Sequence, residues 1–231
     1  MIIPWLPKNQ IAGHAAKLLD DYEDTVREKV HPPIPVESII ERGLKLGLGF
    51  VDLRTELDMD DVLGATFIKQ RRICVDNSLL ECPAEGRLCF TFAHEAGHWV
   101  LHRSLINTAC RSHYQNEIIF CRIKDAQKAI EWQADYFASC LLMPEEAVRR
   151  AFFSIYGPEP LVLYSLKSTF RGPLGFDPCV ENWPLIAANI KETGNFTNVS
   201  KQAMIIRLQE LNLVKNETCA RLSWEASFAM N

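Results

Sequence analysis

The amino-acid sequence predicts an α+β fold in which a short sheet packs against helices and a mostly helical segment follows. Two short apolar runs, residues 65–68 and 73–75, are joined by the polar turn KQRR, as in a β-hairpin. Apolar residues then recur at spacings of three and four within residues 85–102 and again within residues 127–142, which is the period of an amphipathic helix. With 231 residues, 48% hydrophobic and 23% charged, the chain is long enough to bury a core of its own.

Two helices and a strand are predicted before the hairpin. Residues 14–30 have an amphipathic pattern with a strongly charged face, and the following HPP ends that helix. Residues 36–46 form a second predicted helix that ends among glycines, and the short apolar stretch 49–53 is a further strand. Strands are therefore expected only in this first part of the chain.

The chain stays mostly helical after the second strong helix. Residues 145–156 continue the helical pattern, and GPEP at residues 157–160 indicates a boundary. We therefore expect one domain over residues 1–156 and a helical C-terminal segment over residues 157–231, which contains a helix-turn-helix-like part at about 183–214.

Composition narrows the class of protein and its compartment. The net charge of −4 gives no general attraction to nucleic acid or to an acidic membrane surface. No apolar run reaches the length of a transmembrane helix, and the start MIIPWLPKNQ is unlike a signal peptide. The eight cysteines contain no CxxC pair, so we expect reduced, mostly buried thiols in a cytoplasmic protein.

The stretch FAHEAGHWVLH contains an HExxH motif. His94 and His98 lie one helical turn apart, so their imidazoles point the same way and can hold one ion, while Glu95 can reach a water on that ion. In metallopeptidases this arrangement binds Zn²⁺ through the two histidines and uses the glutamate as general base. The motif alone leaves open an ordinary helix that carries surface histidines.

A catalytic zinc needs a third protein ligand and an open fourth position. His102 is unsuitable, because each step of four residues rises about 6 Å along the helix axis; we expect a packing or helix-end histidine there. Glu131 in EWQADYFASCLLMP is the better candidate, and Asp135, four residues on, could accept the spare N–H of a ligand histidine. The alternative is an amphipathic helix whose acidic residues face water.

Three stretches resemble the ImmA/IrrE metallopeptidases and occur in the same order along the chain. They are RICVDNSLLECPAEGRLCFTFAHEAGHWVLH, EWQADYFASCLLMP and NVSKQAMIIRLQELNLV. The resemblance as a whole spans roughly residues 35–215. Residues 1–34 and 161–180 match nothing that we can place.

The resemblance implies a small zincin-like domain, a short mixed sheet packed on two ligand-bearing helices, with Zn²⁺ bound by His94, His98 and Glu131 and with Glu95 as catalytic base. Members of the family are intracellular proteins of bacteria and phages. Several cleave a helix-turn-helix transcriptional repressor and so switch on stress, mobile-element or phage genes. The implied partner is therefore a protein substrate of this kind, with no membrane involved.

Two parts of the mechanism are less well defined by the sequence. The strand at Ile73–Val75 could be an edge strand that holds the substrate by strand addition, or an ordinary core strand. The oxyanion needs a further donor, and Arg111, His113 and Tyr114 in the loop between the ligand helices are equal candidates.

The C-terminal segment raises a rival hypothesis, that of a non-enzymatic DNA- or protein-binding regulator with a structural or vestigial zinc site. Lys201, Gln202 and Arg207 could touch DNA, but residues 181–231 carry five Lys or Arg and five Glu, so their net charge of zero argues against DNA binding. A structural zinc ion is usually coordinated by four protein ligands, whereas this sequence offers three candidate ligands. A toxin–antitoxin role is compatible with either hypothesis.

Overall fold

The computed structural model describes residues 5–58, 62–81, 85–104, 124–163 and 179–217. It confirms the α+β fold class. The chain forms two compact units, one of residues 1–144 with 196–200 and the other of residues 145–195 with 201–231. The domain boundary between residues 156 and 157 stays a prediction, and the helix before it belongs to the second unit.

The first unit contains a three-stranded mixed sheet made of β1 (Gly47–Val51), β2 (Gly64–Phe67) and β3 (Arg72–Asp76). The strand order is β1-β3-β2; β3 runs parallel to β1 and antiparallel to β2, which confirms the predicted hairpin. The expectation that Ile73–Val75 lies at an edge is wrong, because β3 pairs on both sides. Its three central side chains are fully buried, as the unbroken apolar run ICV requires of a central strand.

The helices of the first unit begin with α1 (Lys8–Val26), followed by α2 (Val36–Ser38), the π-helical turn η1 (Ile39–Gly43), α3 (Leu53–Leu57) and the short η2 (Asn77–Leu79). The first helix, expected at residues 14–30, thus starts and ends earlier in the structure. It ends because Arg27 is left-handed at φ 58°, and the N–H of Arg27 donates to the carbonyl of Glu23. Asp52 begins α3 by accepting from the N–H of Thr55.

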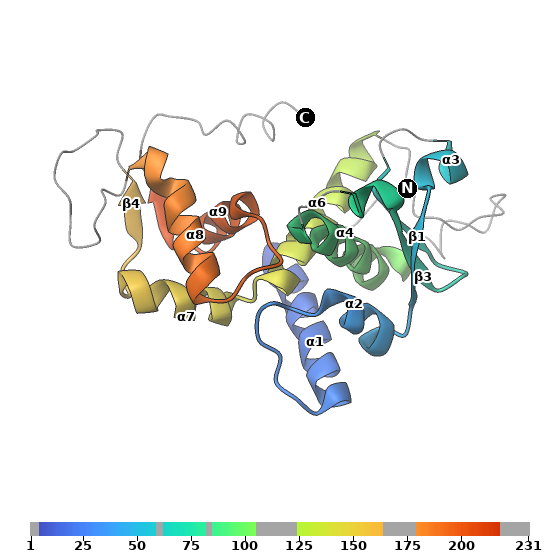
Figure 1. Ribbon diagram of the computed structural model, residues 1–231, viewed down its shortest axis with the longest axis horizontal. Helices are drawn as coiled ribbons and strands as arrows, with labels where there is room; N and C mark the ends of the chain where they lie inside the picture. Colours follow the sequence, from blue (N-terminus) through green and yellow to red (C-terminus); the bar gives the residue numbers. More distant parts are fainter. Residues whose placement is uncertain (1–4, 59–61, 82–84, 105–123, 164–178, 218–231) are drawn as a thin grey trace. The chain divides into compact units, whose positions relative to one another are not determined.

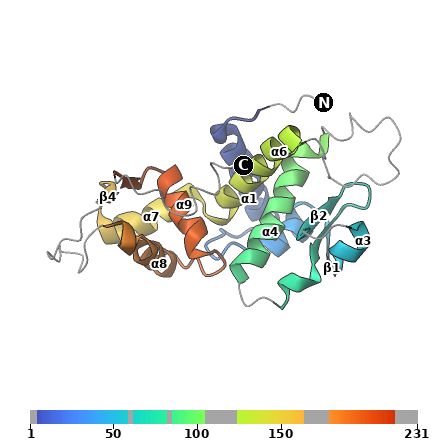
Figure 2. The same cartoon turned by 90° about the horizontal axis from the view of Figure 1, so that it is seen from above.

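Two longer elements carry the predicted ligands. The helix α4 (Glu85–Gly97) continues as the π-helical η3 (His98–His102), and α6 (Lys124–Leu142) lies beside it. In the layers of this unit, α4 lies between the sheet and α6, and α6 packs in turn against α1 (Figures 1 and 2).

Small residues let α4 and α6 approach closely. A Cβ atom at Gly97 would lie 3.2 Å from Cα of Ala134 and 3.1 Å from the ring of Phe137. Ala134 and Ala138 are fully buried, as the sequence analysis expected for this helix contact. The two ligand-bearing helices are thus held at a short, fixed separation.

The second unit contains α7 (Glu145–Tyr156), β4 (Leu161–Leu163), η4 (Val180–Asn182), α8 (Trp183–Thr193), α9 (Lys201–Glu210) and β5 (Val214–Asn216). The strands β4 and β5 pair in parallel, which the sequence analysis did not predict. Three-residue strands are too short to show a period of two, so the pattern gave no signal for them.

The predicted helix pair of the helix-turn-helix-like part is present as α8 and α9, but one of the three residues named as able to touch DNA is buried. Arg207 is only 2% exposed, and its guanidinium lies 3.5 Å from the carboxylate of Glu210. A buried side chain cannot reach a phosphate, whereas Lys201 and Gln202 are exposed.

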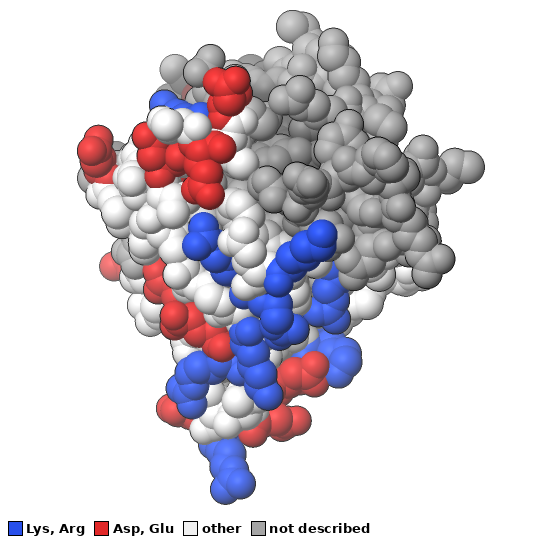
Figure 3. All heavy atoms as spheres, turned by 90° about the vertical axis from the view of Figure 1, so that its right-hand side faces the viewer, with Lys and Arg blue, Asp and Glu red and all other residues white. Residues whose placement is uncertain are grey.

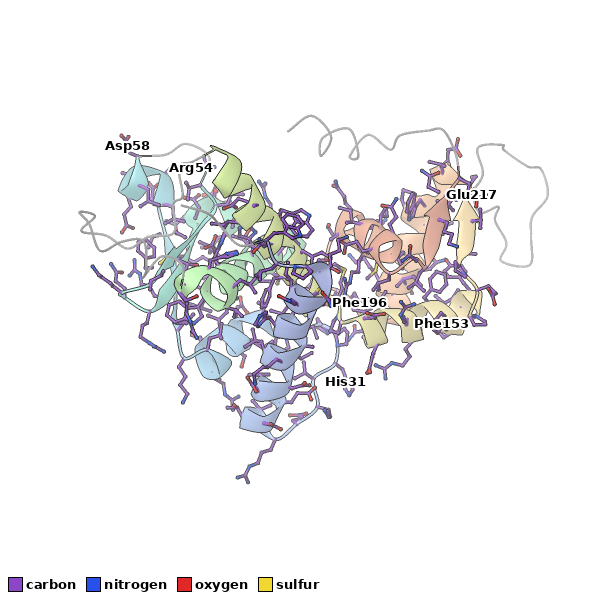
Figure 4. All side chains as sticks on the ribbon, turned by 180° about the vertical axis from the view of Figure 1, so that it is seen from behind. His31, Arg54, Asp58, Phe153, Phe196 and Glu217 are labelled. Carbon is purple, nitrogen blue, oxygen red and sulfur yellow. The ribbon has the colours of Figure 1, made fainter. Side chains whose placement is uncertain are left out.

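The segment 196–200 between α8 and α9 belongs to the first unit. Phe196 (Figure 4) is fully buried, and the side-chain amide of Asn198 donates to the carbonyl of Ile34 at 2.9 Å. A Cβ at Gly86 would lie 2.9 Å from the backbone nitrogen of Ser200, so the segment also touches the start of α4.

None of the described helices combines the length and the apolarity that crossing a bilayer requires. The four described cysteines, Cys74, Cys89, Cys140 and Cys179, are all buried and unbridged, which confirms the expected buried thiols at these positions. The remaining four lie outside the described residues.

Candidate metal centre

The packing of α4 and η3 against α6 brings together His94, His98 and Glu131. The two histidine Nε2 atoms lie 3.0 Å apart, and the carboxylate oxygens of Glu131 lie 3.2 Å from Nε2 of His94 and 3.5 Å from Nε2 of His98. In a tetrahedral zinc site with bonds of about 2.0–2.1 Å, ligand atoms are about 3.3 Å apart. The two imidazoles and the carboxylate, whose ligand atoms all lie within 4.8 Å of one another, are therefore close enough to hold one divalent cation.

The hydrogen bond of His94 supports a metal-binding tautomer. Its Nδ1–H donates to Oδ1 of Asp135 at 2.8 Å, because a carboxylate only accepts. The Nε2 of His94 faces Nε2 of His98 and the carboxylate of Glu131, and these electron-rich atoms repel one another at such distances unless a positive charge, a proton or a metal cation, lies between them. The donor set of two imidazoles and a carboxylate suits Zn²⁺.

The electrostatics of the cluster favour positive charge. Burial opposes the charged form of His94, but hydrogen bonds to Asp135 and Glu131 outweigh it and raise the pKa of His94 to about 10. Burial likewise opposes the ionised form of Glu131, but the adjacent imidazoles of His94 and His98 outweigh it and lower the pKa of this carboxyl. The same negative field that holds a proton here favours a metal cation.

Strand β2 holds Glu95, the expected general base. The hydroxyl of Thr66 lies 2.7 Å from Oε2 of Glu95 and 3.1 Å from its carbonyl oxygen, and both residues are buried. A Cβ atom at Gly64 would lie only 2.6 Å from Oε1 of Glu95, so the backbone of β2 passes directly beside this carboxylate. Neither Gly64 nor Thr66 was predicted to belong to the site, although a glycine in a strand is a signal of close approach.

His102 packs against the cluster and is not one of its ligands, in agreement with the prediction of a packing histidine. It is fully buried, with its Nδ1 3.0 Å from Nδ1 of His98 and its Nε2 3.1 Å from Oε1 of Gln133. Burial, together with the neighbouring His98, lowers the pKa of His102 to about 4. Gln133 had not been singled out, because a contact across 31 positions leaves no local pattern.

An aromatic stack packs on α6 at Trp132 and Tyr136, the residues that directly follow Glu131 and Asp135. The indole of Trp5 stacks on Trp132 at 4.8 Å, Trp132 stacks on Tyr136 at 5.7 Å, and the amine of Lys8 lies 5.0 Å from the Tyr136 ring. The N-terminal region, which resembled nothing known, thus braces the helix that carries Glu131. The candidate oxyanion donors Arg111, His113 and Tyr114 lie outside the described residues.

Two helices that present His₂Glu donors beside a buried carboxylate define a metallopeptidase-like unit. A family model described as the IrrE N-terminal-like domain, a peptidase family, matches residues 48–171, which is more than half of the 231 residues. The chain therefore belongs to this family, and the predicted resemblance to ImmA/IrrE is confirmed. The matched range contains His94, Glu95, His98 and Glu131. No curated protein matches the chain.

Proposed function

We propose that the protein is a zinc-dependent endopeptidase. The observation that carries this proposal is the convergence of Nε2 of His94, Nε2 of His98 and the carboxylate of Glu131, whose ligand atoms all lie within 4.8 Å of one another. In the part of the chain that the structure describes, these three residues are the group of His, Cys, Asp or Glu side chains that could hold a metal. Three protein ligands with room for a fourth are typical of catalytic zinc.

His94, His98 and Glu131 would hold a divalent cation, which would supply Lewis acidity to a water molecule and to the scissile carbonyl. Glu95 takes a proton as the water oxygen bonds to the carbonyl carbon. The carbon–nitrogen bond then breaks, and Glu95 returns the proton to the leaving amine. Thr66 orients the carboxylate for both transfers, since its hydroxyl donates to Oε2 of Glu95.

We place the substrate peptide along β2 and not along β3, which is the central strand. None of the other described strands pairs with the outer edge of β2, so an extended peptide can add there through backbone hydrogen bonds. Gly64 and Thr66, which flank Glu95, belong to this strand. A peptide on β2 therefore lies beside the general base.

The proposed substrate is a helix-turn-helix transcriptional repressor, and the proposed place of action is the cytoplasm. The support is the family membership, together with the resemblance, which implies a substrate of the kind that several ImmA/IrrE proteins cleave. The test uses a repressor encoded next to this gene, incubated with the zinc-loaded protein, with and without a chelator, and with a Glu95→Gln variant. We expect a defined cleavage by the wild type that the chelator and the variant both abolish; cleavage that persists in both would contradict the proposal.

The second candidate function, a regulator that binds DNA or protein without catalysis, draws support from a basic cluster in the first unit. Figure 3 shows Lys and Arg gathering on one face. In the same unit the Arg71 guanidinium lies 3.4 Å from the Lys45 carbonyl, and the guanidinium groups of Arg71 and Arg103 lie 5.6 and 5.2 Å from the Trp99 ring. A gel shift at moderate salt tests it. The carboxylate of Glu95 favours the peptidase, because a structural zinc site has no need of a base.

A further inference from the structure

The two histidine ligands of the centre are supported differently. Nδ1 of His94 is held by the carboxylate of Asp135 at 2.8 Å. Nδ1 of His98 instead lies 3.0 Å from another imidazole nitrogen, Nδ1 of His102. Two neutral imidazoles that meet in this way share a single proton, so one ring donates and the other accepts.

The direction of this hydrogen bond decides whether His98 can bind a metal. If His102 donates, neutral His98 carries its proton on Nε2, the atom that faces His94 and Glu131, and that atom has no electron pair for a cation. If His98 donates from Nδ1, its Nε2 is free to coordinate. The direction of the hydrogen bond therefore depends on the tautomer of His102, because a neutral imidazole carries one proton on either Nδ1 or Nε2.

Gln133 sets the tautomer of His102. Its Oε1 lies 3.1 Å from Nε2 of His102, and an amide oxygen only accepts, so His102 carries its proton on Nε2. Nδ1 of His102 is then an acceptor, and Nδ1–H of His98 donates to it. His98, His102 and Gln133 are all buried, at 4%, 0% and 0% exposure, so solvent is poorly placed to replace either hydrogen bond.

We propose that His102 and Gln133 are positioning residues, a hydrogen-bond relay that fixes His98 in the tautomer whose Nε2 binds the metal. The inference rests on the metal centre of the proposed function. The relay spans both ligand-bearing elements, because His98 and His102 lie on η3 and Gln133 lies two residues after Glu131 on α6. It therefore couples the orientation of one ligand ring to the helix that supplies the carboxylate ligand.

The first test is nuclear magnetic resonance of the full-length, metal-free wild type with ¹⁵N-labelled histidine. We expect the His102 ring to carry its proton on Nε2, and we expect Gln133→Leu to shift it towards a mixture of tautomers. A purely structural role for Gln133 would leave the tautomer unchanged. A His102 proton found on Nδ1 in the wild type would overturn the relay, and this readout requires neither zinc nor a variant of His102.

The second test measures zinc affinity by competition with a chelator in two matched variants of His102. His102→Leu removes the acceptor, and we expect an affinity lower by about tenfold to a hundredfold. His102→Asn places an amide oxygen near the former Nδ1, and we expect it to restore the affinity to within about threefold of the wild type. Equal affinity of His102→Leu and the wild type would overturn the relay. A wild type that binds no zinc would instead contradict the proposed function, while the tautomer measurement would still decide the hydrogen bonding.

Discussion

The hydroxyl of Thr66 lies 2.7 Å from Oε2 of Glu95, so the edge strand β2 directly holds the carboxylate that is the candidate general base. Thr66→Val keeps the shape of this buried side chain and removes the donor. A hydrogen bond to a charged group contributes about 1.5–3 kcal/mol, so we expect kcat/KM for peptide cleavage to fall by about tenfold to a hundredfold. Zinc content should stay at the wild-type level.

Thr66→Ser is the matched control for this substitution, since it keeps the hydroxyl and loses only a methyl group. We expect it to retain most of the activity. Full activity in Thr66→Val would show that β2 does not orient Glu95.

Gly64 leaves space for the same carboxylate. A Cβ at this position would lie 2.6 Å from Oε1 of Glu95 and 2.9 Å from the methyl group of Thr91. We expect Gly64→Ala to displace Glu95 and lower kcat without loss of zinc, measured by steady-state kinetics and metal analysis of one preparation. Gly13→Ala on α1 is the control, since nothing lies within 4 Å of its added methyl group. Unaltered kcat in Gly64→Ala would count against the close approach.

Glu131 and Asp135 lie four residues apart on α6 but have different roles. Glu131 faces both histidine Nε2 atoms, so Glu131→Ala should lose stoichiometric zinc after dialysis against a chelator. Asp135 instead accepts a hydrogen bond from Nδ1 of His94, so Asp135→Ala should bind zinc with an affinity lower by about tenfold to a hundredfold. Metal analysis separates the two, and equal zinc in Glu131→Ala and the wild type would contradict the ligand assignment.

Metal binding should release a proton. The pKa of His94 is raised to about 10 in the metal-free protein, so near neutral pH this ring holds a proton that a cation must displace. Protons then compete with the metal at every pH below about 10, and this group makes the apparent affinity fall about tenfold for each unit of decrease in pH. Calorimetry in two buffers of different ionisation enthalpy measures the protons released.

Asp135→Asn is the control for this prediction, because it removes one of the three carboxylates that raise the pKa of His94. We expect it to release less than one proton per metal near pH 8. A wild-type affinity independent of pH between about 7.5 and 9 would show that His94 is already neutral there.

The ligand helices could be predicted from the sequence because their signal is local. His94 and His98 are separated by one helical turn, and so are Glu131 and Asp135, so helical periodicity alone aligns each pair. The resemblance to ImmA/IrrE then predicted that the residues of both helices bind the same Zn²⁺ ion. The packing of Ala134 beside Gly97 provides the short separation that such a centre needs.

The residues around the ligands could not be predicted in this way. Thr66 meets Glu95 across 29 positions and His102 meets Gln133 across 31, and neither contact leaves a periodic pattern. Strand order was also hidden, since the apolar run at Ile73–Val75 fits a central strand and an edge strand covered on both faces equally well. The strands β4 and β5, three residues each, were too short for any period to appear.

The most direct test of the metal centre is anomalous diffraction at the zinc absorption edge from crystals of the full chain grown with zinc. We expect one strong peak per chain, about 2.0–2.1 Å from Nε2 of His94, from Nε2 of His98 and from a carboxylate oxygen of Glu131. A zinc peak elsewhere, with the carboxylate of Glu131 turned away from both imidazoles, would contradict the account.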